Sequence, residues 1–181
     1  MWFLPVMAVM VSSAPASFLP ESIRATLDQE YPGWKLAPVT AQVQKEFKTH
    51  KPNRFPSLVA GDFDRDGKRD YAVQIALTAP GQEEQIIIVF LARGSGFEEN
   101  IVQSMGLDPT VYLWVSNRML KETGSDAQDK LSNRTVLMVL GGPIGDTTYA
   151  YQDGKFQEIT SEGDPEHPDP SVPRPVTVPG Q

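Results

Sequence analysis

Hydrophobic residues recur at helical spacing in two stretches near the start of the chain. Residues 20–31 carry an apolar side chain at every fourth position and are followed by a Pro-Gly pair, a pattern typical of an amphipathic helix that ends there. A second helix is predicted over residues 40–50, where Thr40 can serve as the N-cap. Between them, residues 34–36 alternate as a short strand. Each predicted helix has one apolar face, so both require a sheet to pack on.

From residue 57 onward, short apolar stretches alternate with turn residues, which is typical of an antiparallel sheet. The predicted strands span residues 57–60, 71–78, 85–92, 97–103, 111–115, 135–140, 147–152 and 155–160. The last two form a hairpin across Asp153-Gly154, and a polar segment from Asn117 to Asn133 separates two others. The sequence therefore predicts an α+β fold: a mostly antiparallel β-sheet with two short N-terminal helices.

Two of these predicted strands do not alternate. Residues 86–91 and 136–140 are apolar at every position, and continuous apolar strands are buried on both faces. We therefore expect both in the middle of a sheet that is covered on each side. Tyr112 and Trp114 share one side of another strand, where packing in the core is the expected role and stacking on a sugar or protein partner is the alternative.

The two ends of the chain have patterns of their own. Residues 1–16 combine an apolar stretch with the small residues Ala14-Pro15-Ala16, which is typical of a signal peptide and predicts a secreted or periplasmic protein. No Lys or Arg precedes the apolar stretch, so an apolar arm packed on the fold is the alternative. Residues 164–181 hold six of the 16 prolines and few apolar side chains, which predicts a disordered tail. A single α+β domain is thus expected over residues 17–163.

Composition excludes several function classes. The chain has no cysteine, which excludes thiol catalysis, zinc–thiolate sites, iron–sulfur clusters and disulfides. Sixteen basic residues against 23 acidic ones give a net charge of -7, which argues against nucleic acid as a partner. No segment after the N-terminal stretch is long enough for a membrane-spanning helix of about 20 residues. A cation is the expected charged partner.

One loop carries the clearest chemistry. Residues 62–70 place aspartate at loop positions 1, 3, 5 and 9 and glycine at position 6. Alternation puts the first three carboxylates on one side of a tight turn, and the carbonyl group at position 7 can add a neutral ligand. Such oxygen-only ligands favour a hard cation of the size of calcium, whereas ordinary turn formation is the alternative. The predicted calcium ligands are Asp62, Asp64, Asp66, Lys68 through its carbonyl group, and Asp70.

The flanks of this loop distinguish it from an EF-hand, which requires Glu at the twelfth position, here Val73, and helices on both sides. The segment Val59–Val73 instead resembles the calcium loop of FG-GAP and VCBS-type repeats, which occur in integrin-like propellers and in many exported bacterial proteins. The resemblance implies side-chain ligation by all four aspartates and a carbonyl ligand from Lys68. A single copy is present, so it implies a small exported protein rather than a multi-bladed propeller.

The function that these observations predict is an exported calcium-binding, non-enzymatic module with a binding or structural role. Its partner class is left open between an envelope or extracellular protein and a glycan. One alternative is a calcium-dependent hydrolase, for which Glu83-Glu84 and Glu98-Glu99 are candidate carboxylate pairs. The other is a secreted enzyme inhibitor that presents the polar segment 117–133.

The N-terminal pattern predicts cleavage after Ala16. The protein released by its native host should begin at Ser17, because small residues at 14 and 16 suit a signal peptidase. Intact-mass measurement of the mature protein checks this. A protein that keeps Met1 in the cytoplasm would contradict the predicted export.

Overall fold

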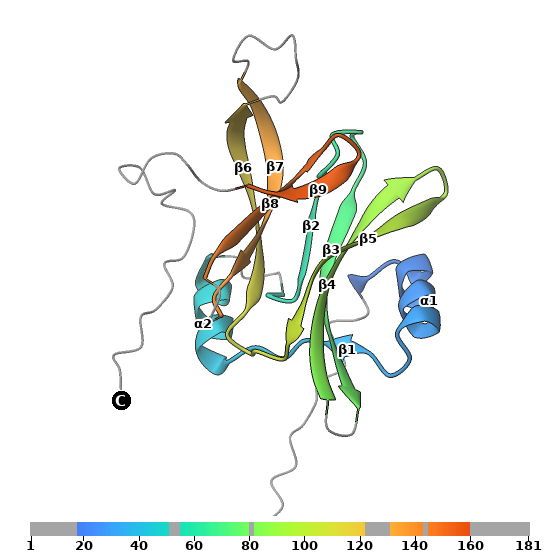
Figure 1. Cartoon of the computed structure of the whole chain (residues 1–181), viewed down its shortest axis with the longest axis vertical. Coiled ribbons are helices and arrows are strands. Elements are labelled where there is room, and N and C mark those ends of the chain that lie inside the picture. The colour runs from blue at the N-terminus through green and yellow to red at the C-terminus, as the bar shows by residue number, and fades with distance from the viewer. Residues whose placement is uncertain (1–17, 51–54, 80–81, 122–130, 143–144, 160–181) are drawn as a thin grey trace, which may run out of the picture.

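The computed structural model describes residues 18–50, 55–79, 82–121, 131–142 and 145–159, and these residues form two helices and nine strands (Figure 1). The helices are α1 (Glu21–Glu30) and α2 (Ala41–His50). The strands are β1 (Lys35–Leu36), β2 (Leu58–Gly61), β3 (Asp70–Ala79), β4 (Gln82–Arg93), β5 (Gly96–Gly106), β6 (Tyr112–Lys121), β7 (Leu131–Leu140), β8 (Thr147–Gln152) and β9 (Lys155–Glu158). The predicted α+β class, with two short N-terminal helices and mostly antiparallel strands, is confirmed.

The strands form two antiparallel sheets rather than the one that the sequence predicted. The first sheet has five strands in the order β1-β3-β4-β5, with β2 also paired to β3, and the second has four in the order β6-β7-β8-β9. The chain passes between them after β5, where Val111 N–H donates to the carbonyl of Asp108 in a turn and Leu113 N–H donates to the carbonyl of Pro56. Backbone bonding in this connection directs β6 away from β5, a step that the hydrophobic pattern does not encode.

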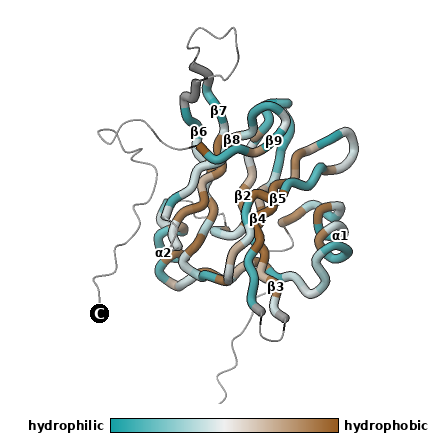
Figure 2. The backbone as a smooth tube through the Cα atoms, in the orientation of Figure 1, coloured by the Kyte–Doolittle hydropathy of each residue, from teal (hydrophilic) through white to brown (hydrophobic). Residues whose placement is uncertain are grey.

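The two sheets pack face to face, and the helices cover their outer sides (Figures 1 and 2). In β4, Ile87, Val89 and Leu91 belong to the core between the sheets, whereas the alternate residues belong to a second core. That second core includes Ile23 and Leu27 of α1. Because side chains alternate along a strand, β4 is buried on both faces, as its continuous apolar run predicted.

Helix α2 covers the second sheet. The hydroxyl oxygen of Thr40 accepts a hydrogen bond from Val43 N–H (3.2 Å), so Thr40 is the predicted N-cap. The Phe47 ring meets Trp114 edge-on, with 5.5 Å between centroids, and also contacts Tyr112. Trp114 is 2% exposed, which confirms core packing for these two aromatic side chains of β6.

The polar segment between β6 and β7 was predicted too broadly. Strand β6 continues to Lys121 and β7 already begins at Leu131, so that the residues around Asn117 and Asn133 form a two-stranded ribbon. Cross-strand backbone hydrogen bonds stabilise polar strands as well as apolar ones, which is why composition misplaced these boundaries. Residues 122–130 of this segment lie outside the described residues.

The predicted signal peptide, residues 1–16, and the predicted tail, residues 164–181, also lie outside the described residues. Within the described ranges, neither helix combines the length and hydropathy that crossing a bilayer requires.

The turn after β7 depends on Gly141. Its φ is +85°, and a Cβ atom there would lie 2.4 Å from the carbonyl oxygen of Thr110. Gly141→Ala should therefore lower the free energy of unfolding by about 2 to 4 kcal/mol, through left-handed strain and a clash with rigid backbone. Urea denaturation measures this. Gly96→Ala is the matched control, because nothing lies within 4 Å of its Cβ position, and it should change stability by less than about 1 kcal/mol.

Candidate metal centre

The aspartate-rich loop joins two adjacent strands of the first sheet. Residues 62–69 connect β2 to β3, and Gly61 pairs directly with Asp70 in the antiparallel register. The hairpin therefore brings loop position 1, Asp62, next to loop position 9, Asp70. The loop lies at the upper end of these strands in Figure 1, beside the β8–β9 hairpin, where Phe63 contacts Phe156.

Three of the four predicted side-chain ligands converge. One carboxylate oxygen from each of Asp62, Asp64 and Asp70 lies within 4.8 Å of the other two. This spacing matches oxygens that share one cation, because oxygens at about 2.4 Å from a calcium ion are separated by at most about 4.8 Å. The structure thus brings together loop positions 1, 3 and 9.

Hydrogen bonds within the loop fold it around these carboxylates. Asp62 Oδ2 accepts a bond from Gly67 N–H (3.1 Å), and Asp64 Oδ1 accepts one from Asp66 N–H (3.2 Å). Gly67 has a φ of +80°, the left-handed conformation that glycine adopts without strain. The glycine at loop position 6 therefore permits the bend that the sequence predicted.

The second oxygen of Asp62 has no protein partner. Asp62 Oδ1 is buried and accepts no hydrogen bond, one of three such side-chain atoms among the described residues. A carboxylate oxygen without a partner in a buried position loses the hydration that stabilised its charge. A bound cation would restore this stabilisation, so the residues present fit a metal ion.

Asp66 is not among the three converging carboxylates. Its two oxygens accept hydrogen bonds from Lys68, one from the backbone N–H (2.8 Å) and one from Nζ (3.0 Å). These bonds hold the pKa of Asp66 below its usual value, with the side-chain bond to Lys68 as the larger cause. Ligation by Asp66 and by the Lys68 carbonyl group stays a prediction.

Asp70 has a structural role that the spacing did not reveal. It is fully buried, and its two oxygens accept hydrogen bonds from Phe63 N–H and Ala92 N–H, each 2.8 Å long. Burial raises the pKa of Asp70, and the two backbone bonds oppose that rise by stabilising its charge. Asp70 thus ties both the loop and the end of β4 to the start of β3.

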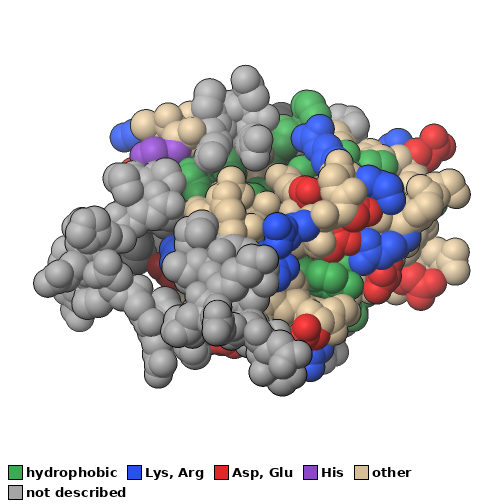
Figure 3. Space-filling view, turned by 90° about the horizontal axis from the view of Figure 1, so that it is seen from above, with side chains coloured by type: hydrophobic (Ala, Val, Ile, Leu, Met, Phe, Trp, Pro, Cys, Tyr) green, Lys and Arg blue, Asp and Glu red, His purple; other side chains and the backbone are tan. Residues whose placement is uncertain are grey.

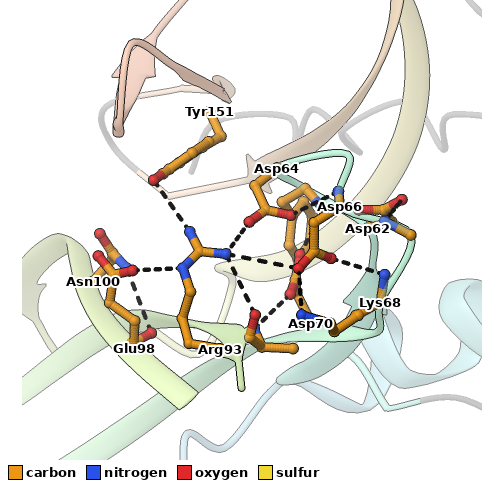
Figure 4. A network of polar contacts seen from close by, with 12 residues as sticks. Asp62, Asp64, Asp66, Lys68, Asp70, Arg93, Glu98, Asn100 and Tyr151 are labelled. Carbon is orange, nitrogen blue, oxygen red and sulfur yellow. Dashed lines mark hydrogen bonds and ion pairs between the residues drawn. The ribbon is translucent and has the colours of Figure 1, made fainter. Parts of the chain in front are cut away.

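Arg93 belongs to the site, although sequence analysis did not identify it. Its Nη1 forms an ion pair with Asp64 Oδ2 and lies 4.0 Å from Asp66 Oδ2, while Nε donates to Glu98 (2.8 Å) and Nη2 to the Tyr151 hydroxyl (3.3 Å) (Figure 4). The bond to Asp64 is the largest cause that raises the pKa of Arg93. The sequence held no signal for this contact, since Arg93 is the last residue of β4 and the β3–β4 hairpin separates it from the loop.

On the face seen from above, Lys and Arg side chains lie among Asp and Glu side chains (Figure 3). The visible described surface therefore carries mixed charges, which does not favour a partner bound through one sign of charge alone.

Three of the four glutamates in the candidate carboxylate pairs form side-chain hydrogen bonds within the fold. Glu98 binds Arg93, Glu99 accepts a bond from the Tyr31 hydroxyl, and Glu84 accepts one from Ser104. A shallow hollow of about 420 Å³ beside α2 is lined by Ala41, Gln44, Lys45, Lys48 and Thr49. A void of about 10 Å³ is lined by Gln103, Met105, Val111, Val139, Gly141, Gly142 and Gly145. Among the described residues that line these two cavities, none is acidic.

Comparison with models of protein families, with curated proteins and with solved structures finds no match to this chain.

The anchoring role of Asp70 can be separated from ligation. Asp70→Asn replaces one buried acceptor by an amide donor that faces a backbone N–H, so we expect a loss of about 2 to 4 kcal/mol in the free energy of unfolding. The loss should be present in EDTA as well as in calcium, as measured by urea denaturation. Asp153→Asn, at a turn where asparagine tolerates the observed φ of 51°, is the control and should be neutral. An effect of Asp70→Asn confined to calcium would contradict the anchoring role.

Proposed function

We propose that this protein is an exported calcium-binding module without catalytic activity, in which the ion holds the β2–β3 loop in place. The observation that carries the proposal is the buried, unpartnered oxygen of Asp62 in a group of three converging carboxylates. Asp62, Asp64 and Asp70 would hold the ion, and Asp66 and the Lys68 carbonyl group are the further predicted ligands.

The charge balance supports a divalent ion. The three clustered carboxylates carry three negative charges when ionised, and Arg93 compensates one of them at Asp64. Asp66 has its own partner in Lys68. Two negative charges remain, which a divalent cation would neutralise. Calcium is favoured over magnesium because calcium accepts many protein oxygens in flexible geometry, whereas magnesium retains several waters.

The position of the loop supports a structural or binding role. The ion would stabilise a hairpin end at the edge of the molecule, beside β9 and away from the two described cavities. The partner would be an envelope or extracellular protein or a glycan. The resemblance of the loop to FG-GAP and VCBS-type repeats supports this role, as does the signal-peptide pattern of residues 1–16. A calcium-dependent hydrolase has less support, because no carboxylate lines either cavity in the part of the chain that the structure describes.

The second candidate function is that of a secreted enzyme inhibitor, and the shape of the second sheet supports it. Strand β8 pairs with β7 only between residues 137 and 139, so the β6–β7 ribbon extends beyond the rest of its sheet (Figure 1). Such a ribbon can present its tip to another protein. Residues 122–130, which connect the two strands in the sequence, lie outside the described residues.

Calcium should stabilise the fold by binding the native loop and not the unfolded chain. We expect a dissociation constant of about 10⁻⁴ to 10⁻³ M. Calcium at ten times this concentration then adds about 1.4 kcal/mol to the free energy of unfolding, which raises Tm by about 3 to 6 °C. Asp62→Asn should abolish this shift, because it removes the charge of the unpartnered oxygen without touching Arg93. In EDTA, the same variant should melt at or slightly above the wild-type temperature, since it relieves repulsion between carboxylates.

Thermal melts in EDTA and in millimolar calcium measure both effects. Glu83→Gln is the control, because it removes an exposed carboxylate at the far end of β4 and should keep the wild-type calcium shift. A wild-type melt that calcium leaves unchanged, together with no binding in equilibrium dialysis, would contradict the proposed function.

A further inference from the structure

We infer that Arg93 is a built-in competitor of the metal ion, and that it sets the calcium affinity of the loop. This inference rests on the proposed function. The guanidinium group neutralises Asp64, one of the three converging carboxylates, from within the protein. A cation that binds these carboxylates must share Asp64 with Arg93 or displace it.

The contacts of Arg93 place its positive charge directly at the site. The Asp64 side chain is only 5% exposed, so its ion pair with Nη1 is shielded from water on the carboxylate side. The same nitrogen lies 4.0 Å from Asp66 Oδ2, so it also approaches a second carboxylate of the loop. A divalent ion bound by Asp64 would lie within a few ångströms of this guanidinium group, and the two positive charges would repel one another.

Arg93 is held in this position from two further strands. Glu98 on β5 accepts from Nε, and the Tyr151 hydroxyl on β8 accepts from Nη2. These bonds fix the orientation of the guanidinium plane, so the contact of Nη1 with Asp64 costs little further side-chain entropy. Glu98 is also the partner that remains when Asp64 turns to the ion, which keeps the displaced arginine paired.

The arrangement makes Arg93 and calcium alternative partners of Asp64. Without the ion, Arg93 relieves the repulsion among the carboxylates and preserves the loop. With the ion, its charge opposes binding. Removal of Arg93 should therefore tighten calcium binding by about tenfold, a change that corresponds to a charge repulsion of moderate strength near a protein surface.

Isothermal titration with calcium chloride tests the inference on the wild type, Arg93→Gln and Arg69→Gln. Arg69 lies in the aspartate-rich loop, and Arg69→Gln removes the same charge as Arg93→Gln. The Arg69 side chain, however, stacks on Tyr71 and forms no ion pair with a described residue. We expect a dissociation constant about tenfold lower for Arg93→Gln and a change below about threefold for Arg69→Gln. An equal decrease in both variants would show that net charge alone sets the affinity and would overturn the role of the contact.

The outcomes separate the inference from the proposed function. Calcium binding by the wild type with an unchanged or weaker affinity in Arg93→Gln would overturn the inference and leave the proposed function standing. Binding by Arg93→Gln alone would support the inference and overturn calcium binding by the native protein at millimolar concentration. No binding by either would overturn both.

A second variant keeps the test decisive if Arg93→Gln does not fold by circular dichroism. Arg93→Lys retains the charge, but a single ammonium group cannot contact Asp64, Glu98 and Tyr151 together. It should tighten calcium binding by less than Arg93→Gln, by about twofold to threefold. An affinity equal to or weaker than that of the wild type would overturn the inference.

Discussion

The buried carboxylate of Asp70 connects the elements on which the candidate metal centre depends. One oxygen binds Phe63 N–H in the loop and the other binds Ala92 N–H at the end of β4. Because Arg93 is the next residue, the bond to Ala92 also determines where its guanidinium group can reach. One buried acceptor that joins the loop, the start of β3 and the end of β4 thus helps to place a cationic side chain beside the acidic loop. A buried acceptor of this kind is costly to lose, which makes the arrangement rigid.

Burial of β4 on both faces holds Ala92 and Arg93 in a fixed position relative to the loop. One face of the strand packs on α1 and the other on the second sheet, so β4 cannot shift without opening two cores. The loop between β2 and β3 is therefore anchored to a strand that cannot move easily. Its carboxylates are held close together although they repel one another, and the charges of Arg93 and Lys68 offset part of that repulsion.

Charge compensation within the protein reduces the repulsion among the carboxylates of the loop. Asp66 pairs with Lys68 inside the loop, and Asp64 pairs with Arg93 from outside it. Asp62 keeps a buried oxygen without a protein partner. The protein itself therefore offsets the charge of two of the four carboxylates in the loop. Under the proposed function, a divalent cation would neutralise the other two.

The sequence by itself determined the elements whose pattern is local. These patterns involve residues that are close together in the sequence, and each predicted the structure of its own segment. They are the helical spacing, the Thr40 cap, the continuous apolar runs of β4 and β7, and the spacing of the aspartates. Only the tertiary structure decided the division into two sheets, the extension of the β6–β7 ribbon and the contact of Arg93 with Asp64. It also decided which three of the four aspartates converge. These features depend on groups far apart in the chain, whose distance no local periodicity encodes.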